Sequence, residues 1–287
     1  MFGSPALINR VGRYGQQHGI KLPTLRRVIS AGAPVPASVL ERFAAMLPAT
    51  AEVFTPYGAT EALPVCSIGS RQILEQTRAL TEQGHGVCVG QPMKGIELHI
   101  IAIDDGPIPC WDEGLKVADG QIGEIVVKGP QVTARYFNRP KADALAKIRD
   151  PAGGFFHRMG DLGYRDEAGR IWFCGRKAHR VISPDQTRYS IPCEAIFNTH
   201  PQVYRSALVG VGARHQQRPV ICIELEKGVK KSTEEQIRRE LLDLACQYAV
   251  TTGIRELLFH PAFPVDIRHN AKIFREKLAV WAQKELS

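Results

Sequence analysis

Tyr57-Gly58-Ala59-Thr60-Glu61, which follows the apolar stretch Ala51-Glu52-Val53-Phe54, decides the fold of this chain. The apolar stretch predicts a buried strand, and the pentapeptide lies just beyond it. In that place an aromatic ring can stack on a purine, a glycine lets backbone approach a phosphate, and a carboxylate can hold a hard cation. Without further context, a polar turn with Glu61 capping a following helix explains these residues equally well.

The sequence around this stretch alternates between helix and strand. Residues 6–30 predict an amphipathic helix that leads into the strand Arg27-Val28-Ile29. A second helix is predicted over 35–47, with Pro36 at its start and Ser38 and Glu41 at the spacing of a capping box. This alternation predicts a layer of helices on a parallel sheet.

The pattern changes near residue 87. Period-two alternation and Gly-Pro or Asp-Gly punctuation predict a small, mostly antiparallel β unit, and after Arg176 an α+β pattern follows. We therefore expect three parts, namely 1–86, 87–176 and 177–287. The predicted strands are 96–101, 123–128, 170–173, 206–211, 220–226 and 256–259, and the later helices follow a capping box at 232–235 and span 270–284.

Composition narrows the class of protein. The net charge of +8 permits an anionic ligand, but the basic residues are dispersed and show no basic stripe with aromatics, so we expect no nucleic-acid partner. No apolar run approaches the ~18 residues that a membrane-spanning helix needs. The seven cysteines form no CxxC pair, which argues for reduced thiols in a cytoplasm and against zinc or a disulfide framework.

Three further features carry groups suited to a nucleotide. Gly32-Ala33-Pro34 would let backbone lie flat against an adenine ring, although a strand-to-helix turn explains it as simply. Asp161 can accept from both hydroxyls of a ribose, and Arg176 lies across a hairpin from it; the alternative is a hairpin with a surface ion pair. Lys272 is one of 37 Lys and Arg residues, so it is a candidate only when it is taken together with these other motifs.

Taken in order, these motifs resemble the adenylate-forming superfamily of acyl-CoA synthetases, luciferases and peptide-synthetase adenylation domains. The resemblance also includes Gly123-Glu124-Ile125, Tyr136-Phe137-Asn138 and Gly175-Arg176, and it spans essentially the whole chain. It implies a mixed α/β and α+β fold: the tail of a large AMP-binding domain, with an α/β layer and a small β-barrel-like subdomain, followed by a small mobile α+β C-terminal domain.

The resemblance also implies roles for the site residues. ATP and Mg²⁺ would be the cofactors and a fatty acyl carboxylate the substrate. Glu61 would hold the metal on the phosphates and Lys272 would bridge the carboxylate and the α-phosphate. The remaining nucleotide-binding residues would be Gly32, Ala33 and Pro34 with Tyr57, Gly58 and Ala59 at the adenine side, Thr60 at the phosphate, and Asp161 with Arg176 at the ribose.

A narrower resemblance concerns Cys174 to Val181, the segment from Tyr189 to Phe197, and Arg205 to Val211. These segments are similar to the β-lactone synthetases of bacterial long-chain olefin biosynthesis. In that branch a β-hydroxyl attacks its own activated carbonyl and expels AMP, so no coenzyme A is required. Other enzymes of the olefin pathway would then be protein partners. The alternatives are a fatty-acid–CoA ligase and a non-catalytic fragment that only binds nucleotide or docks to such partners.

Three departures from the family pattern bear on these expectations. The family's large domain is about twice as long, and its Gly/Ser/Thr-rich phosphate loop has no counterpart here, so we expect a fragment with weak or no adenylation by itself. The usual hinge acid is Ala178, which favours lactone formation over a thioester step. The usual Ser-Gly-Lys is Asn270-Ala271-Lys272, which keeps the lysine but changes the turn.

Overall fold

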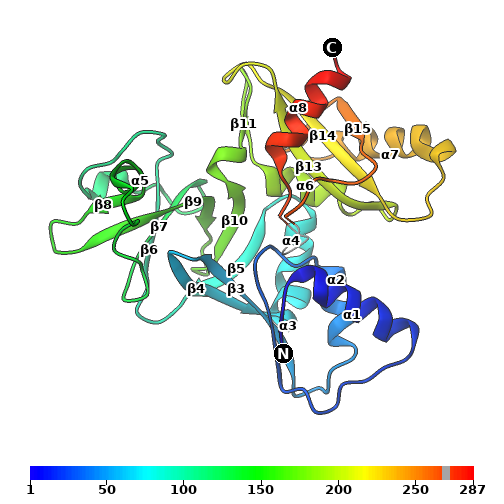
Figure 1. The fold of residues 1–287 in the computed structure, drawn as a ribbon, viewed down its shortest axis with the longest axis horizontal. Helices are drawn as coiled ribbons and strands as arrows, with labels where there is room; N and C mark the ends of the chain where they lie inside the picture. Colours follow the sequence, from blue (N-terminus) through cyan, green and yellow to red (C-terminus); the bar gives the residue numbers. More distant parts are fainter. Residues whose placement is uncertain (267–271) are drawn as a thin grey trace. The chain divides into compact units, whose positions relative to one another are not determined.

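A computed structural model describes residues 1–266 and 272–287. The chain forms two compact units, and the second unit includes one short segment from within the sequence of the first (Figure 1). The first unit contains Met1–Thr77 and Cys88–Lys177, and the second contains Arg78–Val87 and Ala178–Ser287. The predicted three-part division at residues 86 and 176 stays a prediction.

The first unit begins with the predicted alternation of helix and strand. Strands β1 (Phe2–Gly3), β2 (Arg27–Ser30) and β3 (Glu52–Ala59) are parallel neighbours, and helices α1 (Pro5–Gln17) and α2 (Ala37–Ala44) connect them. The helices cover one sheet face, where Val28 and Val53 pack against Ile8, Leu40 and Phe43. The parallel sheet is therefore confirmed. The capping box at α2 was wrong, because Pro36 is the N-cap and no side chain caps the helix.

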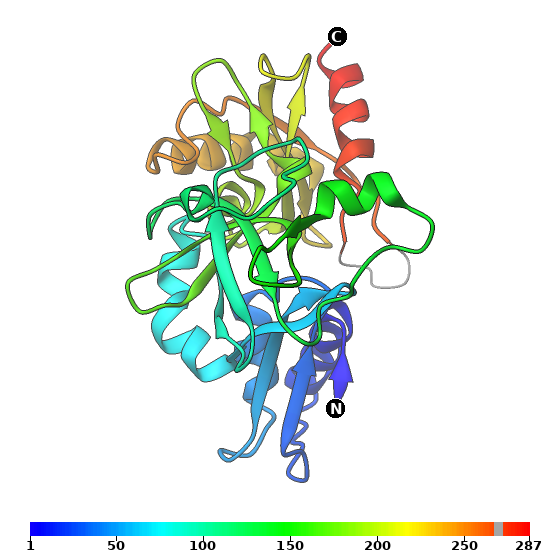
Figure 2. The same cartoon turned by 90° about the vertical axis from the view of Figure 1, so that its left-hand side faces the viewer.

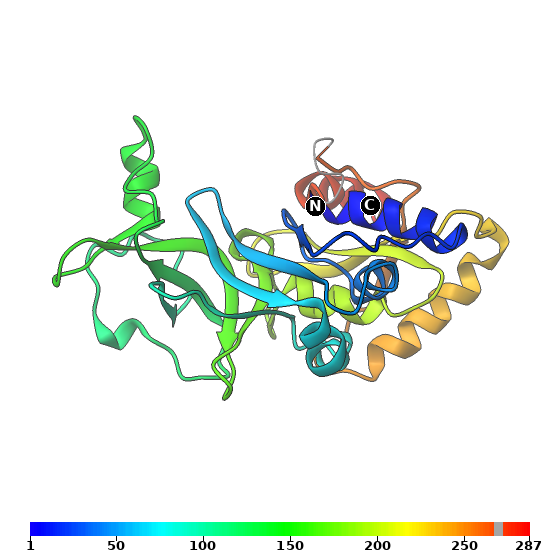
Figure 3. The same ribbon diagram turned by 90° about the horizontal axis from the view of Figure 1, so that it is seen from below.

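β3 runs five residues farther than the predicted strand and turns back directly into β4 (Ala62–Gly69), its antiparallel neighbour (Figure 3). The extra length arises because Thr55 to Ala59 pair with β4, which a local pattern does not reveal. After β4 the chain forms a broken helix of α3 (Ser70–Gln72), the π-helical η1 (Ile73–Thr77) and α4 (Arg78–Glu82), the last of which belongs to the second unit.

The sheet continues through antiparallel strands, of which the sequence predicted those at 96–101, 123–128 and 170–173. The order is β1-β2-β3-β4-β5-β10-β9-β7-β6, with β8 beside β9, so the α/β layer and the β-rich part share one ten-stranded sheet. A core of Val65, Ile100, Ile125, Val127 and Ile171 lies under the later strands. The elements are β5 (Val87–Pro92), β6 (Glu97–Ile101), η2 (Glu113–Leu115), β7 (Gly123–Lys128), α5 (Pro140–Ala146), β8 (Lys147–Arg149), β9 (Phe155–Arg165) and β10 (Ile171–Arg176).

The second unit is built on a three-stranded sheet of β13 (Val203–Val211), β14 (Arg218–Leu225) and β15 (Glu256–Phe259), in which the first pair is antiparallel and the second parallel. Alternating residues of β13 face opposite cores, as strand geometry requires. Leu208 packs with helices α6 (Ser190–Phe197) and α7 (Glu234–Cys246), whereas Ala207 and Val209 pack with α8 (Arg275–Glu285), red in Figure 2. The remaining elements are η3 (Lys177–His179), β11 (Val181–Ile182), β12 (Thr187–Arg188) and η4 (Lys231–Thr233).

Two local predictions in this unit need correction. The capping box at 232–235 was wrong: Thr233 is the N-cap of α7 and no side chain accepts from the first amides of the helix, while the Thr233 hydroxyl donates to the Lys230 carbonyl in the preceding 3-10 turn. The final helix begins at Arg275, since Phe274 is its N-cap; Asn270 and Ala271, where it was expected to start, lie outside the described residues. In the described part of the chain, no helix combines the length and the apolar character needed to cross a membrane.

Candidate functional site

The motif Tyr57–Glu61 lies at the turn of the β3–β4 hairpin. Tyr57, Gly58 and Ala59 are the last residues of β3, and Ala59 pairs with Ala62 across the two-residue turn made by Thr60 and Glu61. Thr60 is exposed, and Glu61 is half-buried. The motif is therefore a hairpin turn and not the start of a helix, so the alternative in which Glu61 caps a following helix was wrong.

A second hairpin, β9–β10, carries Asp161 and Arg176. The two residues are direct register partners, and a β-bulge between Phe173 and Gly175 adjusts the strand just before Arg176. Gly160 precedes Asp161 with a φ of 65°, a conformation that favours glycine. The hairpin was an open alternative in the sequence, but the ion pair is not a surface one, because Asp161 is only 4% exposed.

Tyr57 of the first hairpin lies beside Asp161 and Arg176 of the second. The Tyr57 hydroxyl donates to Asp161 Oδ2 at 2.7 Å, and the Tyr57 ring lies 5.8 Å from the ring of Phe173. Arg176 Nη1 lies 3.0 Å from Asp161 Oδ1 and donates to the Met159 carbonyl. Two sequence-predicted nucleotide residues are thus joined directly and the third contacts one of them.

Asp161 has one acceptor that no hydrogen bond uses. Its Oδ1 is buried and, although close to Arg176, has no hydrogen-bond partner among the described residues. Burial raises the pKa of Asp161, while the Arg176 guanidinium opposes that shift. Burial and the neighbouring Asp161 carboxylate raise the pKa of Tyr57 well above its ordinary value, so the phenol stays protonated and remains a donor. A buried acceptor without a hydrogen bond is uncommon, and here the Arg176 guanidinium lies beside it.

Glu61 has a partner that sequence reasoning did not assign to the site. The hydroxyl of Tyr136 donates to Glu61 Oε1 at 2.9 Å, across 75 residues of sequence. Burial alone would raise the pKa of Glu61, but the Tyr136 hydroxyl and a backbone hydrogen bond outweigh it and hold that pKa below its usual value. Burial, with Glu61 beside it, raises the pKa of Tyr136 to about 12. Tyr136 belongs to the Tyr136-Phe137-Asn138 motif of the family resemblance, and that motif was the feature of the sequence that could have assigned Tyr136 to the site.

The fit of a magnesium ion to this site depends on Glu61. An ionised carboxylate with a fixed orientation is a ligand that Mg²⁺ accepts. Among the described residues, no group of three or more His, Cys, Asp and Glu side chains could hold a metal ion together. Mg²⁺ commonly takes one or two carboxylates and completes its shell with water and substrate phosphates, so a single Glu61 fits that mode of binding.

Gly32-Ala33-Pro34 lies between β2 and α2, at the same sheet edge as Tyr57. β2 ends at Ser30, and because β2 and β3 are parallel neighbours, the loop begins at the carboxyl end of β2, beside the carboxyl end of β3 where Tyr57 lies. Gly32 has a φ of 104°, and a Cβ built there meets no atom of the described residues within 4 Å. The loop therefore requires glycine for its backbone and leaves open room beside it.

The two remaining predicted site residues, Ala178 and Lys272, belong to the second unit. Ala178 is exposed in η3 and is the first residue of the second unit after Lys177. Lys272 is exposed and directly precedes the segment that enters α8, and its carbonyl accepts from the Asp266 amide at 2.9 Å. The hinge and catalytic roles of these residues stay predictions.

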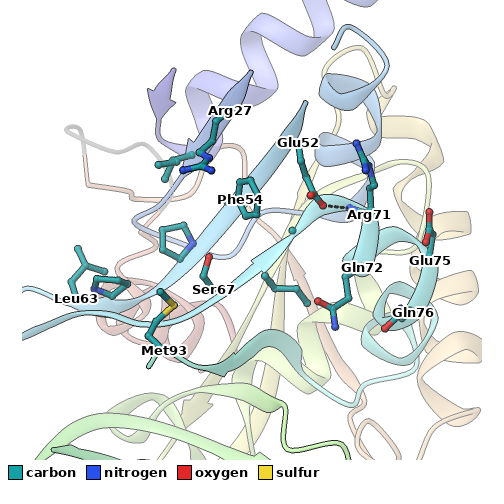
Figure 4. Close-up of a pocket in the computed structure, with 15 residues that line it drawn as sticks. Arg27, Glu52, Phe54, Leu63, Ser67, Arg71, Gln72, Glu75, Gln76 and Met93 are labelled. Atoms are coloured by element: carbon teal, nitrogen blue, oxygen red, sulfur yellow. Dashed lines mark hydrogen bonds between the residues drawn. The ribbon is translucent and has the colours of Figure 1, made fainter. Parts of the chain in front are cut away.

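A large hollow in the first unit contains none of these residues. It has a volume of about 920 Å³ and lies over β2, β3 and β4, where Ile29 and Phe54 face away from α1 and α2 (Figure 4). Charged groups gather at one end, where the Arg71 amide donates to Glu52 Oε1 at 2.9 Å, while Leu63 and Met93 lie at the other. The hollow is separate from the Tyr57–Asp161–Arg176 group.

The sequence of this chain is similar to those of known AMP-binding enzymes. Residues 1–137 match the family described as AMP-binding enzyme. The chain is 50% identical to the olefin beta-lactone synthetase of Xanthomonas campestris pv. campestris over 289 residues, which cover 99% of this chain and 51% of the relative. The chain thus spans about half the length of the curated relatives it matches.

Solved structures share the fold at lower identity. An amide bond synthetase from Marinactinospora thermotolerans matches with a TM-score of 0.76 at 23% identity, covering 98% of this chain and 51% of that structure. An o-succinylbenzoate coenzyme A synthetase from Bacillus subtilis, solved with ATP and a magnesium ion, matches with a TM-score of 0.71 at 22% identity, covering 96% and 50%. The family match, the close relative and the shared fold agree: this chain belongs to the adenylate-forming superfamily of AMP-binding enzymes.

Proposed function

We propose that this chain is part of an enzyme that uses ATP to activate a long-chain β-hydroxy fatty acyl carboxylate as acyl-AMP and then closes a β-lactone. The observation that carries the proposal is the Tyr57–Asp161–Arg176 group, with one buried Asp161 oxygen left to accept from a ligand. The 50% identity to an olefin beta-lactone synthetase favours the lactone branch.

In the first step, a carboxylate oxygen of the acyl substrate attacks the α-phosphorus of ATP and pyrophosphate leaves. Asp161 Oδ1 accepts a ribose hydroxyl, and Arg176 supplies positive charge beside the same sugar. Gly32-Ala33-Pro34 and the ring of Tyr57 border the adenine, and Thr60 contacts a phosphate oxygen. Lys272 is assigned to the carboxylate and α-phosphate, where negative charge grows in the transition state.

Magnesium, held by Glu61 together with the phosphates of ATP, would supply charge neutralisation on the pyrophosphate leaving group. The task of the protein at this point is orientation. The Tyr136 hydroxyl fixes Glu61 Oε1 and leaves the other carboxylate oxygen for the metal.

In the second step, the β-hydroxyl oxygen attacks the acyl carbon, a new carbon–oxygen bond closes the four-membered ring, and the bond to AMP breaks. The hydroxyl proton is released as the oxygen attacks. Nucleophile and carbonyl belong to one molecule, so proximity assists ring closure and coenzyme A has no part in it.

Product analysis tests this proposal. A longer polypeptide that contains this chain is incubated with ATP, Mg²⁺ and a 3-hydroxy fatty acid, with and without coenzyme A, and products are identified by mass spectrometry. We expect a β-lactone and AMP without coenzyme A. A thioester formed only with coenzyme A would identify a fatty-acid–CoA ligase, and nucleotide binding without either product would leave only a binding or docking role.

The isolated chain is expected to adenylate weakly or not at all, since it spans about half of its relatives. Robust ATP–pyrophosphate exchange by residues 1–287 alone would contradict that expectation. Titration calorimetry with AMP tests the ribose assignment separately. Asp161→Asn should weaken AMP binding about tenfold or more, because the amide nitrogen cannot accept.

A further inference from the structure

A buried ion pair joins α6 to the beginning of α8 in the second unit. Arg275 Nη2 lies 2.8 and 2.6 Å from the two carboxylate oxygens of Glu194, and Arg275 Nε donates to Oε1 at 3.1 Å. The side chains are 14% and 6% exposed. Arg275 is the first residue of α8 and lies three positions after Lys272. The proposed function gives this pair no part.

Glu194 is itself fixed to the sheet. Its Oε1 accepts from the Leu208 amide of β13 at 2.9 Å, and its carbonyl accepts from the Ser206 hydroxyl at 3.1 Å. Burial raises the pKa of Glu194, although Arg275 opposes that shift. These contacts hold the Glu194 carboxylate in place. Arg275 stabilises its charge, because a buried carboxylate without a cationic partner is costly.

Lys272 and the residues that follow it are hydrogen-bonded to residues 264–266. The Asp266 amide donates to the Lys272 carbonyl and the Phe274 amide donates to the Pro264 carbonyl, both at 2.9 Å. Val265 and Ile273 form an isolated antiparallel bridge. The backbone of 272–274 thus runs as a short ladder that ends at Arg275.

We propose that Glu194 and Arg275 are positioning residues for Lys272: their two-point contact fixes where the ladder enters α8 and so fixes the backbone that carries the lysine. This inference rests on the proposed role of Lys272. A guanidinium with two contacts to one carboxylate defines both position and orientation, which a lysine at 275 cannot do. Apolar contacts of α8, through Leu278 and Ala282, hold the helix but leave its first residue less defined.

Hydrogen exchange on the chain tests the positioning directly. Glu194→Gln keeps an oxygen for the Leu208 amide but loses the charge, and Arg275→Lys keeps the charge but loses the two-point contact. We expect each variant to raise exchange in a peptide covering 272–277 by about tenfold, with the α7 peptide unchanged. Glu240→Gln removes the pair with His200 elsewhere in the same unit and serves as the matched control. Unchanged exchange at 272–277 in both variants would overturn the proposal.

A binding cycle tests whether the pair acts through Lys272. The probe is a dodecanoyl sulfamoyl adenosine, a stable analogue of acyl-AMP, titrated by calorimetry. We expect Lys272→Ala and Glu194→Gln each to raise the Kd about tenfold, and the double variant to be no weaker than Lys272→Ala alone. Additive effects would overturn the positioning role. Failure of the wild-type chain to bind the probe would count against the proposed function, and exchange would still decide the positioning. If Glu194→Gln does not fold, as judged by circular dichroism, Arg275→Lys answers both questions.

Discussion

The hydroxyl of Tyr57 donates to the Asp161 carboxylate at 2.7 Å, across 104 residues of sequence. This contact joins the β3–β4 hairpin to the β9–β10 hairpin within one sheet. It satisfies Oδ2 of a carboxylate that is 4% exposed and leaves Oδ1 without a hydrogen bond among the described residues. Tyr57 therefore orients the acceptor that we assign to the ribose.

Removing the Tyr57 hydroxyl should lower the stability of the first unit. Tyr57→Phe leaves Asp161 Oδ2 buried without its donor, which costs about 1–3 kcal/mol. Urea denaturation followed by tryptophan fluorescence measures the change in the free energy of unfolding. Tyr14→Phe, at a residue that is 59% exposed, is the matched control and should have little effect. Equal stabilities for Tyr57→Phe and wild type would mean that the contact contributes nothing.

A buried ionic cluster centred on Glu124 should contribute more to stability than the Tyr57 hydrogen bond does. Glu124 is 1% exposed and its Oε2 contacts Arg158 Nη2 at 2.6 Å and Lys177 Nζ at 2.9 Å. Glu124→Gln removes the negative charge that contacts both cations and takes the ion-pair partner from the buried Arg158. We expect the free energy of unfolding to fall by about 3–5 kcal/mol. The comparison is Glu82→Gln at the more exposed Arg78–Glu82 pair, which should change stability far less.

The stability of the chain should depend on His157 below pH 6.5. Burial, together with the Lys147 ammonium, lowers the pKa of His157 from 6.5 to about 4. Because the folded state binds the proton less readily than the unfolded state, its contribution is fully present above pH 6.5 and is lost as the pH falls towards 4. The loss approaches about 3 kcal/mol at the lower end.

Denaturation curves at several pH values test this dependence. In His157→Gln the decline between pH 6.5 and 4 should be shallower by that amount, since glutamine does not titrate. His18→Gln, on the exposed end of α1, should follow the wild-type curve. Parallel curves for His157→Gln and wild type would show that the histidine is protonated in both states or in neither.

The sequence predicted most of the strands, for reasons that are local. Period-two alternation in Glu97–Ile101 and Gly123–Lys128 follows from one buried face, and the structure confirms both strands. The parallel order of β2 and β3 follows from the helix between them. The assignment of Tyr57 and Asp161 to one nucleotide site came only from the family resemblance, and their direct hydrogen bond was not predicted.

Other features depend on pairing that no local pattern contains. Ala62–Gly69 forms a strand because it pairs with β3, although Pro64 lies within it and nothing marked it as a strand. The ties of Glu61 to Tyr136 and of Glu194 to Arg275 span 75 and 81 residues, so neither spacing nor periodicity could predict them. The two capping boxes failed for the opposite reason, because the local motif was present but the helix began elsewhere.

The contact between Tyr136 and Glu61 should determine how strongly magnesium promotes ATP binding. Glu61→Gln removes the charge that we assign to the metal, and we expect ATP affinity in Mg²⁺ to fall about tenfold, with AMP affinity unchanged. Tyr136→Phe keeps the charge but loses the 2.9 Å hydrogen bond, so a smaller loss, about threefold, is expected.

Calorimetric titrations with ATP in Mg²⁺, with ATP in chelator and with AMP separate these effects. Glu97→Gln, whose side chain is 53% exposed, controls for loss of one negative charge in the same unit. Equal losses for ATP and AMP, or losses that persist in chelator, would place Glu61 at the nucleotide and not at the metal.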